Sequence, residues 1–255
     1  MRIALIPPIQ MLKHVEGQLY QLMLPQLVSE PYYSNKFKEF TTNGLHVILD
    51  NGAAEGEKIS EERLINVASS YRVTEVAVPD VPHNANKTFT KLLGFSGKHF
   101  TFMQRSRCDW GYVAQGTSVQ EAFDLVKKVA TSIYSELYSV VFLPRLLIKS
   151  SDDYYARIKL AEMINNLFPK LEIHLFGASR MFPQEYKAAA KEAPFIRSMD
   201  TSQPFVYAYH GMTMYNFGTD EGPARPKNYF KLVEADFDMG LVNRNVQEMV
   251  AWTDK

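Results

Sequence analysis

Cysteine is nearly absent from the sequence. Cys108 is the one cysteine in 255 residues, which excludes an internal disulfide and any zinc site built from several cysteines. This scarcity is also typical of a reducing compartment. Nothing beside Cys108 marks its thiol as an activated nucleophile, so we interpret it as an inert thiol.

Long apolar runs are missing as well. No run approaches the roughly 18 apolar residues of a membrane span. The apolar residues 3–6, which two prolines follow, are too few for the core of a signal peptide. We therefore expect a soluble cytoplasmic protein without a membrane partner, located in the host cytoplasm if a phage encodes it.

Neither sign of charge is in excess, because Lys plus Arg and Asp plus Glu number 28 each. No global positive field draws the protein to nucleic acid, and any such contact must use a local basic patch. The first apolar run is not followed by Gly-x-Gly-x-x-Gly, so a Rossmann fold would lack its phosphate-binding loop.

Short apolar runs alternate with amphipathic stretches along the chain. Runs typical of strands occupy 2–6, 45–50, 74–80, 111–116, 138–144, 171–177 and 194–200, and 205–209 is a candidate for the eighth. Stretches typical of helices occupy 60–71, 118–137, 151–168 and 182–193, and 97–107 fits a strand or a short helix.

This alternation, with about eight strands in about 250 residues, predicts an α/β protein with a (β/α)₈ TIM-type barrel rather than an open doubly wound sheet. We expect a single domain in which residues 1–210 form the barrel. Residues 211–255 are rich in Gly, Pro, Asp and Asn and are expected to pack on the barrel as a C-terminal extension.

Polar side chains stand at the ends of several predicted strands, namely Asp50, Asp80, Gln115 and Asp200, and another strand ends on Gly177. Any one aspartate here has an alternative role as a turn residue or a helix N-cap. In a barrel, however, the carboxyl ends of the strands share one rim, where substrates bind. Carboxylates gathered in a cleft shift one another's pKa values, which divides acid and base roles among them.

Five short motifs follow one another between about residue 45 and residue 205: ILDNGA, VPDVP, WGYVAQG, HLFGAS and SMDTS. In this order they resemble the strand-end motifs of the tRNA-guanine transglycosylase superfamily. WGYVAQG, and HLFGAS followed by MDTS, are the most specific. Members of that superfamily are (β/α)₈ barrels that exchange guanine for a 7-deazaguanine.

The resemblance implies a mechanism and a role for each matching residue. Asp200 would be the nucleophile that holds C1′ of the target nucleotide as a covalent ester, and Asp50 would be the general acid and base. Four residues would bind the base by hydrogen bonds, close backbone approach or stacking: Asp80, Gln115, Gly177 and Phe176. The resemblance implies no cofactor and no metal.

The sequence departs from the superfamily pattern at three places. Ala54 stands where the family has an aromatic stacking partner, and Leu143 and Pro144 replace a double glycine. The three cysteines and the histidine of the zinc site are absent. The chain therefore most resembles the short, zinc-less DNA 7-deazaguanine transglycosylases of bacteria and phages, whose substrates would be DNA and a free 7-deazaguanine such as 7-cyano-7-deazaguanine.

Alternatives remain for the activity and the partners. They are a tRNA transglycosylase of the same chemistry, a barrel glycoside hydrolase that uses Asp50 and Asp200, and a non-catalytic barrel that binds nucleic acid. A homodimer or partner proteins of a modification complex are compatible with the sequence.

Basic residues near the predicted rim are candidates for phosphate contacts, although a single surface arginine is more often simply solvated. The main candidates are Arg105, Arg145 and Arg180, and Arg225 in the loop near the C-terminus is another. The alternating aromatics Phe205, Tyr207 and Tyr209 fit either a stacking face or packing inside the barrel. We interpret His174 as a core histidine.

Overall fold

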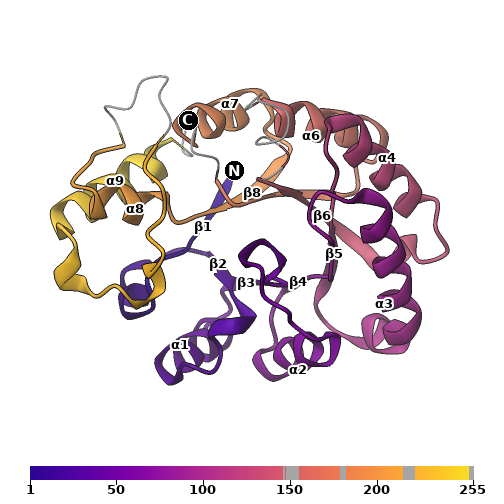
Figure 1. Ribbon diagram of the computed structural model, residues 1–255, viewed down its shortest axis with the longest axis horizontal. Helices are drawn as coiled ribbons and strands as arrows, with labels where there is room; N and C mark the ends of the chain where they lie inside the picture. Colours follow the sequence, from indigo (N-terminus) through magenta and orange to yellow (C-terminus); the bar gives the residue numbers. More distant parts are fainter. Residues whose placement is uncertain (146, 148–154, 179–181, 215–221, 253–255) are drawn as a thin grey trace.

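Eight parallel strands form a closed barrel in the computed structural model (Figure 1). The structure describes residues 1–145, 147, 155–178, 182–214 and 222–252. The strands follow chain order around the barrel, and β8 pairs with β1 to close it. They are β1 (Arg2–Leu5), β2 (Tyr20–Met23), β3 (His46–Leu49), β4 (Glu75–Ala77), β5 (Asp109–Val113), β6 (Tyr138–Pro144), β7 (Glu172–Phe176) and β8 (Ile196–Thr201). The predicted TIM-type fold is confirmed.

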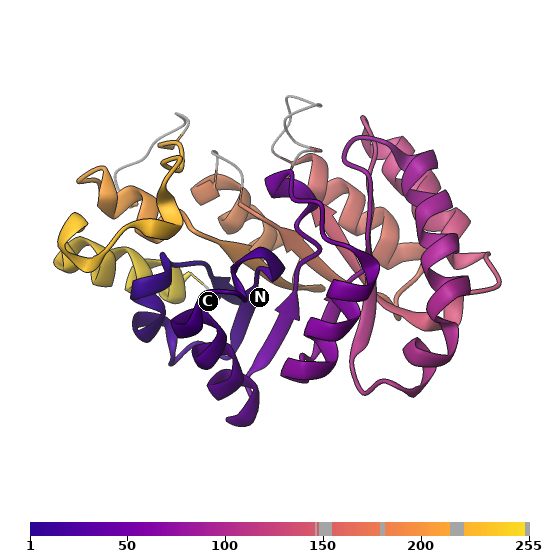
Figure 2. The same ribbon diagram turned by 60° about the horizontal axis from the view of Figure 1, so that its bottom comes forward.

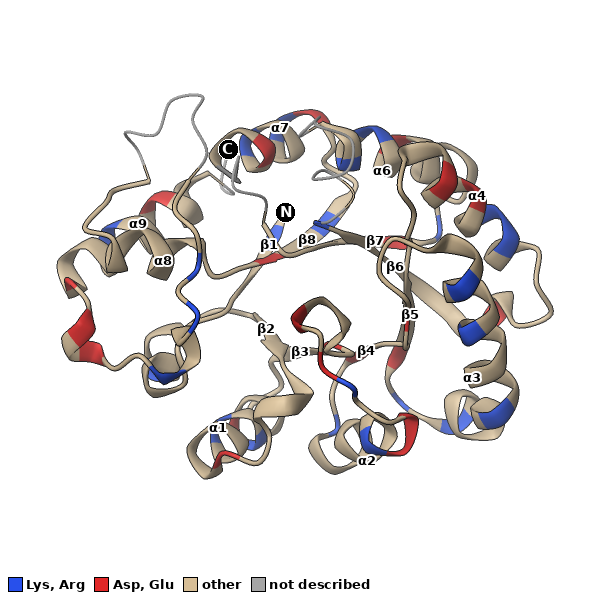
Figure 3. Ribbon diagram, viewed as in Figure 1, with Lys and Arg blue, Asp and Glu red and all other residues tan. Residues whose placement is uncertain are grey.

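Helices surround the barrel, and Lys, Arg, Asp and Glu residues are distributed along most of them (Figure 3). They are α1 (Pro31–Thr42), α2 (Glu61–Tyr71), α3 (Ala85–Arg105), α4 (Val119–Ala130), α6 (Ala156–Leu167), α7 (Phe182–Glu192), α8 (Gln203–Tyr209) and α9 (Met239–Ala251). The described residues contain no helix that combines the length and the apolar character needed to cross a membrane.

Side-chain caps start the predicted helices where the sequence indicates. The Ser60 hydroxyl accepts a hydrogen bond from the backbone N–H of Arg63 at the start of α2, and Ser118 caps α4 in the same way. The stretch predicted as one helix over 118–137 divides, because α4 ends at Ala130 and a separate 3₁₀ turn, Ser135–Leu137, precedes β6. Residues 97–104 and Arg105 belong to the long helix α3.

The prediction of the eighth strand was wrong. That strand is β2, which the sequence analysis missed, whereas residues 205–209 lie in helix α8. Pro204 stands in the first turn of α8, where a missing N–H costs nothing. Phe205 and Tyr207 are fully buried, so these aromatics do not form the stacking face of a strand.

Apolar side chains fill the middle of the barrel. This inner cluster consists of Ala4, Leu22, Leu24, Ile48, Ala77, Val113, Val140 and Phe142. Phe142 crowds the backbone of β5 so closely that a Cβ at Gly111 would lie 2.3 Å from the ring. The glycine of the WGYVAQG motif therefore admits a large aromatic residue into the interior.

Below this layer, at the amino ends of the strands, the interior is polar. The buried carboxylate of Glu75 accepts hydrogen bonds from Arg197 at 2.7 Å and contacts His46 at 2.6 Å. Arg197 also pairs with Glu172 and lies over the ring of Tyr20. These contacts hold the pKa of Glu75 below its usual range even though burial acts in the opposite direction.

The C-terminal extension packs beside α8, and both views show α9 next to that helix (Figures 1 and 2). Asn245 of α9 is buried, accepts a hydrogen bond from the Met214 N–H, and donates to the carbonyls of Pro204 and Met212. The hydroxyl of Tyr229 donates to the Ile6 carbonyl at 2.5 Å. The extension is thereby held at the carboxyl end of β1.

Candidate active site

A cavity of about 560 Å³ opens at the carboxyl ends of the strands. All of the strand-end residues that the sequence singles out line it: Asp50, Asp80, Gln115, Phe176, Gly177 and Asp200. Four of them follow their strands by one to three residues, whereas Phe176 ends β7 and Asp200 lies within β8. The rim of the barrel thus brings together side chains that are far apart in the sequence.

Asp200 is held from two directions. Its Oδ1 accepts a hydrogen bond from the backbone N–H of Gly177 at 2.9 Å and lies 3.0 Å from Nε2 of His174. Gly177 has a φ of +66°, a conformation that glycine adopts without strain and that turns this N–H toward the carboxylate. No described residue forms a hydrogen bond with Oδ2 of Asp200.

Asp50 follows β3 directly and is almost fully buried. Its burial, together with the negative charges of Glu55 and Asp200, raises the pKa of this carboxyl well above its usual range. The one opposing contact of note is the hydrogen bond from the backbone N–H of Asn51 to Oδ1, at 2.7 Å. Asp50 therefore keeps its proton at a higher pH than an ordinary aspartic acid.

Asp80 is fixed by two amide side chains. Asn51 donates from Nδ2 to Oδ1 at 2.9 Å, and Gln115 donates from Nε2 to Oδ2 at 2.5 Å. Burial raises the pKa of Asp80, and these two hydrogen bonds oppose the shift. Each carboxylate oxygen still has a lone pair for a ligand, because each accepts only one of these bonds.

The orientation of the Gln115 carboxamide is fixed by the loop after β4. Its Oε1 accepts a hydrogen bond at 3.0 Å from the backbone N–H of His83, a non-glycine residue with a φ of +60°. The NH₂ group therefore points toward Asp80 and has one N–H left for a ligand. This strained residue beside the cavity keeps donor and acceptor in one arrangement.

Phe176 and Arg145 lie on the side of the cavity next to Asp200. Phe176 stacks on Phe142 with the ring centroids 4.3 Å apart. The Arg145 side chain lines the cavity, and its guanidinium has no hydrogen bond or ion pair with any described residue. Partial burial and the positive charges of Arg225 and Arg157 lower the pKa of Arg145.

Arg225 brings the C-terminal extension into the site. It lines the cavity, lies over the rings of Tyr229 and Phe230, and pairs with Glu55 at 3.3 Å. Glu55 belongs to a 3₁₀ turn after β3, and the two residues are 170 positions apart in the chain. Arg225 and Arg145 thus place two cations beside a cluster of carboxylates.

One of the predicted basic residues, Arg105, does not join the site. Arg105 is the last residue of α3, four positions before β5 begins, so it lies on the side of the barrel where the strands start. The prediction that it lies near the rim was wrong, because the helix extends over a segment that the sequence leaves ambiguous. Arg180 lies outside the described residues.

Two residues of the site, Asn51 and Glu55, were not expected from the sequence, and neither was the contact between His174 and Asp200. A signal for His174 did exist. His174 comes two positions before Phe176 on β7, so the two side chains lie on the same face of the sheet, and Ser198 and Asp200 share a face of β8 in the same way. The two strands pair His174 with Ser198. The core interpretation of His174 was incomplete, because the buried ring contacts Asp200.

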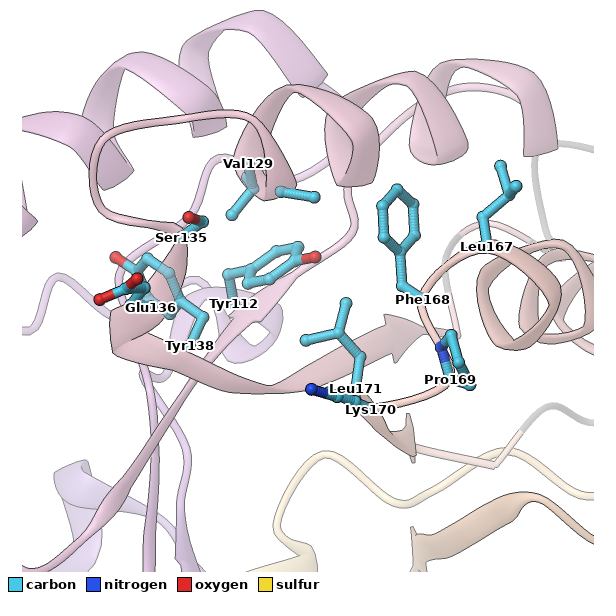
Figure 4. A pocket seen from close by; sticks show the side chains of 11 residues that line it. Tyr112, Val129, Ser135, Glu136, Tyr138, Leu167, Phe168, Pro169, Lys170 and Leu171 are labelled. Carbon is cyan, nitrogen blue, oxygen red and sulfur yellow. The ribbon is translucent and has the colours of Figure 1, made fainter.

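A second depression, of about 370 Å³, lies on the outside of the barrel between α4 and the turn after α6 (Figure 4). Its lining is mainly apolar, with Tyr112, Val129, Leu167, Phe168 and Leu171. Among the described residues that line it, Glu136 and Lys170 are the charged ones. It lacks the grouped carboxylates of the rim cavity, which is therefore the candidate active site.

Within the described part of the chain, no group of three or more His, Cys, Asp and Glu side chains is placed to hold a metal ion. No model of a known protein family matches the sequence, and a search of curated proteins found no match either.

Proposed function

We propose that the protein is a DNA-guanine transglycosylase, which exchanges guanine in DNA for 7-cyano-7-deazaguanine or a derivative of it. The supporting observation is that Asp50, Asp80, Gln115 and Asp200 line one cavity at the rim of a closed barrel. They also follow one another along the chain in the order of the superfamily motifs that the sequence resembles.

In the first half of the proposed reaction, Oδ2 of Asp200 attacks C1′ of the target nucleotide. A C1′–Oδ2 bond forms while the C1′–N9 bond breaks, and the electron pair of the broken bond leaves with guanine. Asp50 gives its proton to the departing base, a role that its raised pKa supports because the acid must be protonated beforehand. The sugar is then an ester of Asp200.

In the second half, the carboxylate of Asp50 takes the N9 proton of the incoming 7-deazaguanine. N9 attacks C1′, the C1′–Oδ2 bond breaks, and its electron pair returns to Asp200. Asp50 is protonated again at the end of the cycle. Two displacements at C1′ retain the configuration of the glycosidic bond, as in a retaining glycosidase.

Asp80 and Gln115 suit the recognition of a guanine-like base. The carboxylate of Asp80 has acceptor capacity for the N1–H and the exocyclic amine, and the remaining N–H of Gln115 suits the O6 acceptor. Phe176 supplies an aromatic face in the wall of the same cavity. Both guanine and 7-deazaguanine carry this hydrogen-bonding edge, as an exchange reaction requires.

Arg145 and Arg225 support a nucleic-acid substrate. Both residues line the cavity. The phosphates of a target nucleotide that is flipped out of a duplex into this cavity would lie close to the two guanidiniums. The missing zinc ligands favour DNA over tRNA, because the zinc site belongs to the tRNA enzymes that the sequence resembles.

Base exchange is tested by incubating the protein with labelled guanine, and in parallel with labelled 7-cyano-7-deazaguanine, together with single-stranded DNA, duplex DNA or tRNA. Label should enter DNA with the wild type and with Asp124→Asn, an aspartate on the exposed surface of α4. Label should not enter with Asp200→Asn. Incorporation into tRNA alone would contradict the DNA assignment, and release of base without incorporation would indicate a hydrolase.

A further inference from the structure

We propose that His174 is a positioning residue for Asp200: by occupying Oδ1 from inside the barrel, it makes Oδ2 the attacking atom and stabilises the carboxylate when the sugar ester breaks. The kinetic part of this inference rests on the proposed function. The hydrogen-bonding state of His174 does not, and can be tested independently of base exchange.

A directed chain of hydrogen bonds fixes the protonation of the imidazole ring. Arg197 can only donate, and its Nε–H donates to the Ser198 hydroxyl oxygen at 3.3 Å. The Ser198 proton is then available for Nδ1 of His174, which lies 2.7 Å from the same oxygen. The ionised carboxylate of Asp200 can only accept, so the proton of the neutral ring is on Nε2, which donates to Asp200 at 3.0 Å, and Nδ1 is the acceptor for Ser198.

The surroundings keep this arrangement in place. At the amino ends of the strands, the carboxylate of Glu75 binds the Arg197 guanidinium. Oε1 lies 2.5 Å from Nη1, and Oε2 lies 2.7 Å from Nη2. Phe142 and Phe176 contact the imidazole edge-on, with ring centroids 5.6 Å and 5.3 Å away. His174 has no exposed surface, and its burial lowers its pKa although the bond to Asp200 acts in the opposite direction. The ring is thus a neutral donor.

Occupation of Oδ1 decides which oxygen reacts. Gly177 N–H and His174 Nε2–H both donate to Oδ1, which has two lone pairs, whereas Oδ2 has no partner among the described residues. Once the ester has formed, Oδ1 is its carbonyl oxygen and regains negative charge when the C1′–Oδ2 bond breaks. Two fixed donors at this atom favour the departure of the carboxylate in the second half of the reaction.

Ser198, His174 and Asp200 do not form a serine-nucleophile triad. Ser198 has no exposed surface and does not line the cavity, so a substrate carbon has no path to its hydroxyl. In a serine-nucleophile triad, moreover, the serine is on Nε2 and the carboxylate on Nδ1, which is the reverse of this arrangement. The hydrogen bonds from Arg197 through Ser198 to His174 therefore orient the carboxylate of Asp200.

The first test reads the imidazole by ¹⁵N NMR of the histidine-labelled protein, with the His174 signals identified by their loss in His174→Gln. We expect a proton on Nε2 and none on Nδ1. A proton on Nδ1, or a doubly protonated ring at neutral pH, would overturn the inference. This result stands whether or not the protein exchanges bases.

The second test separates the two halves of the reaction in single turnovers with a guanine-containing DNA oligonucleotide and labelled guanine. In His174→Phe, breakdown of the covalent adduct should slow about 10- to 100-fold, more than its formation, so that adduct accumulates. His174→Gln, which keeps an N–H donor, should restore part of the rate, and His99→Gln on the outside of α3 should match the wild type.

Each outcome has one meaning. Unchanged adduct breakdown in His174→Phe, or equal slowing of both halves without accumulation, would overturn the positioning role. If His174→Phe does not fold, His174→Leu, which also lacks an N–H donor, carries the same comparison, and wild-type rates in that variant would overturn the positioning role. A wild type that forms neither adduct nor exchange product would refute the proposed function, leaving the NMR result to decide on the geometry.

Discussion

The backbone N–H of Gly177, which follows β7, donates a hydrogen bond to Oδ1 of Asp200 in β8 across 2.9 Å. This bond joins two neighbouring strand ends at the rim, and it exists because Gly177 adopts a φ of +66°. The orientation of the candidate nucleophile therefore depends on a backbone conformation that other residues adopt only with strain.

Gly177→Ala should weaken both the fold and the site. Space is not the obstacle, because an added Cβ would lie an ordinary 3.6 Å from Cβ of Arg145. The left-handed φ alone should cost about 1–2 kcal/mol in the free energy of unfolding, and relaxation of the backbone should turn the N–H away from Asp200 and lower base exchange. Denaturant titration and exchange assays measure the two effects.

Gly44→Ala is the matched control for this substitution. Gly44 has a φ of +75° with no atom within 4 Å of an added Cβ, and it precedes β3 on the opposite side of the barrel. It should lose similar stability but keep full exchange activity. Equal loss of activity in both variants would show that the Gly177–Asp200 bond has no special role.

Asp50→Asn should raise stability while abolishing exchange. Because burial and nearby carboxylates raise the pKa of Asp50, its ionised form is costly in the folded state. The wild type should therefore lose stability relative to Asp50→Asn as the pH rises from the ordinary pKa of aspartate to the raised pKa of Asp50, and the difference should stay constant at higher pH. Exchange should fall at least about 100-fold, as expected for loss of a general acid.

Chemical denaturation of both proteins across a pH series measures this difference. Parallel stability curves would contradict the raised pKa. Asp124→Asn is the control for removal of a carboxylate, because Asp124 is exposed and its pKa is lowered by Lys127 and Gln120, so its stability effect has the opposite sign.

Arg145→Gln and Arg225→Gln should each weaken DNA binding and reduce its dependence on salt. Loss of one phosphate contact lowers the slope of log K against log salt by about one. Arg105→Gln is the matched control, because Arg105 lies at the amino ends of the strands. The measurement is DNA affinity at several salt concentrations. Equal slopes of log K against log salt in all three variants would show that Arg145 and Arg225 do not contact DNA phosphates.

Arg157 supports the rim from behind. This buried residue pairs with Glu185 through two hydrogen bonds of 2.7 Å and donates from Nη1 to the carbonyls of Leu143, Phe176 and Gly177. Arg157→Met removes the charge that balances Glu185 and should cost about 3–5 kcal/mol in the free energy of unfolding. The double variant Arg157→Met with Glu185→Leu should recover part of this loss; no recovery would contradict a buried ion pair.

Local pattern alone predicted the barrel and its rim, because apolar runs that end on polar residues are visible without tertiary information. It failed at β2, a strand of four residues with the buried polar side chain Gln21, whose Nε2 donates to the carbonyls of Val15 and Gln18. It also failed at α8, where alternating aromatics imitate a strand although Pro204 begins a helix.

The detailed arrangement of the site depends on contacts between distant segments. Asn51 matters because it reaches Asp80 on the next strand end, and His174 because β8 brings Asp200 and Ser198 beside it. Arg225 reaches the cavity only because Tyr229 ties the extension to the end of β1. Strand pairing and tail packing supply this information, and neither can be read from spacing along the chain.

The central claim is that Asp200 forms a covalent ester with the sugar of a nucleotide. The most direct measurement is to denature the protein during turnover with a DNA oligonucleotide and to locate the attached DNA by peptide mass spectrometry. The account predicts an adduct that lacks one guanine, attached to the peptide that contains Asp200, and no adduct with Asp200→Ala. An adduct on another residue, or one that persists in Asp200→Ala, would contradict it.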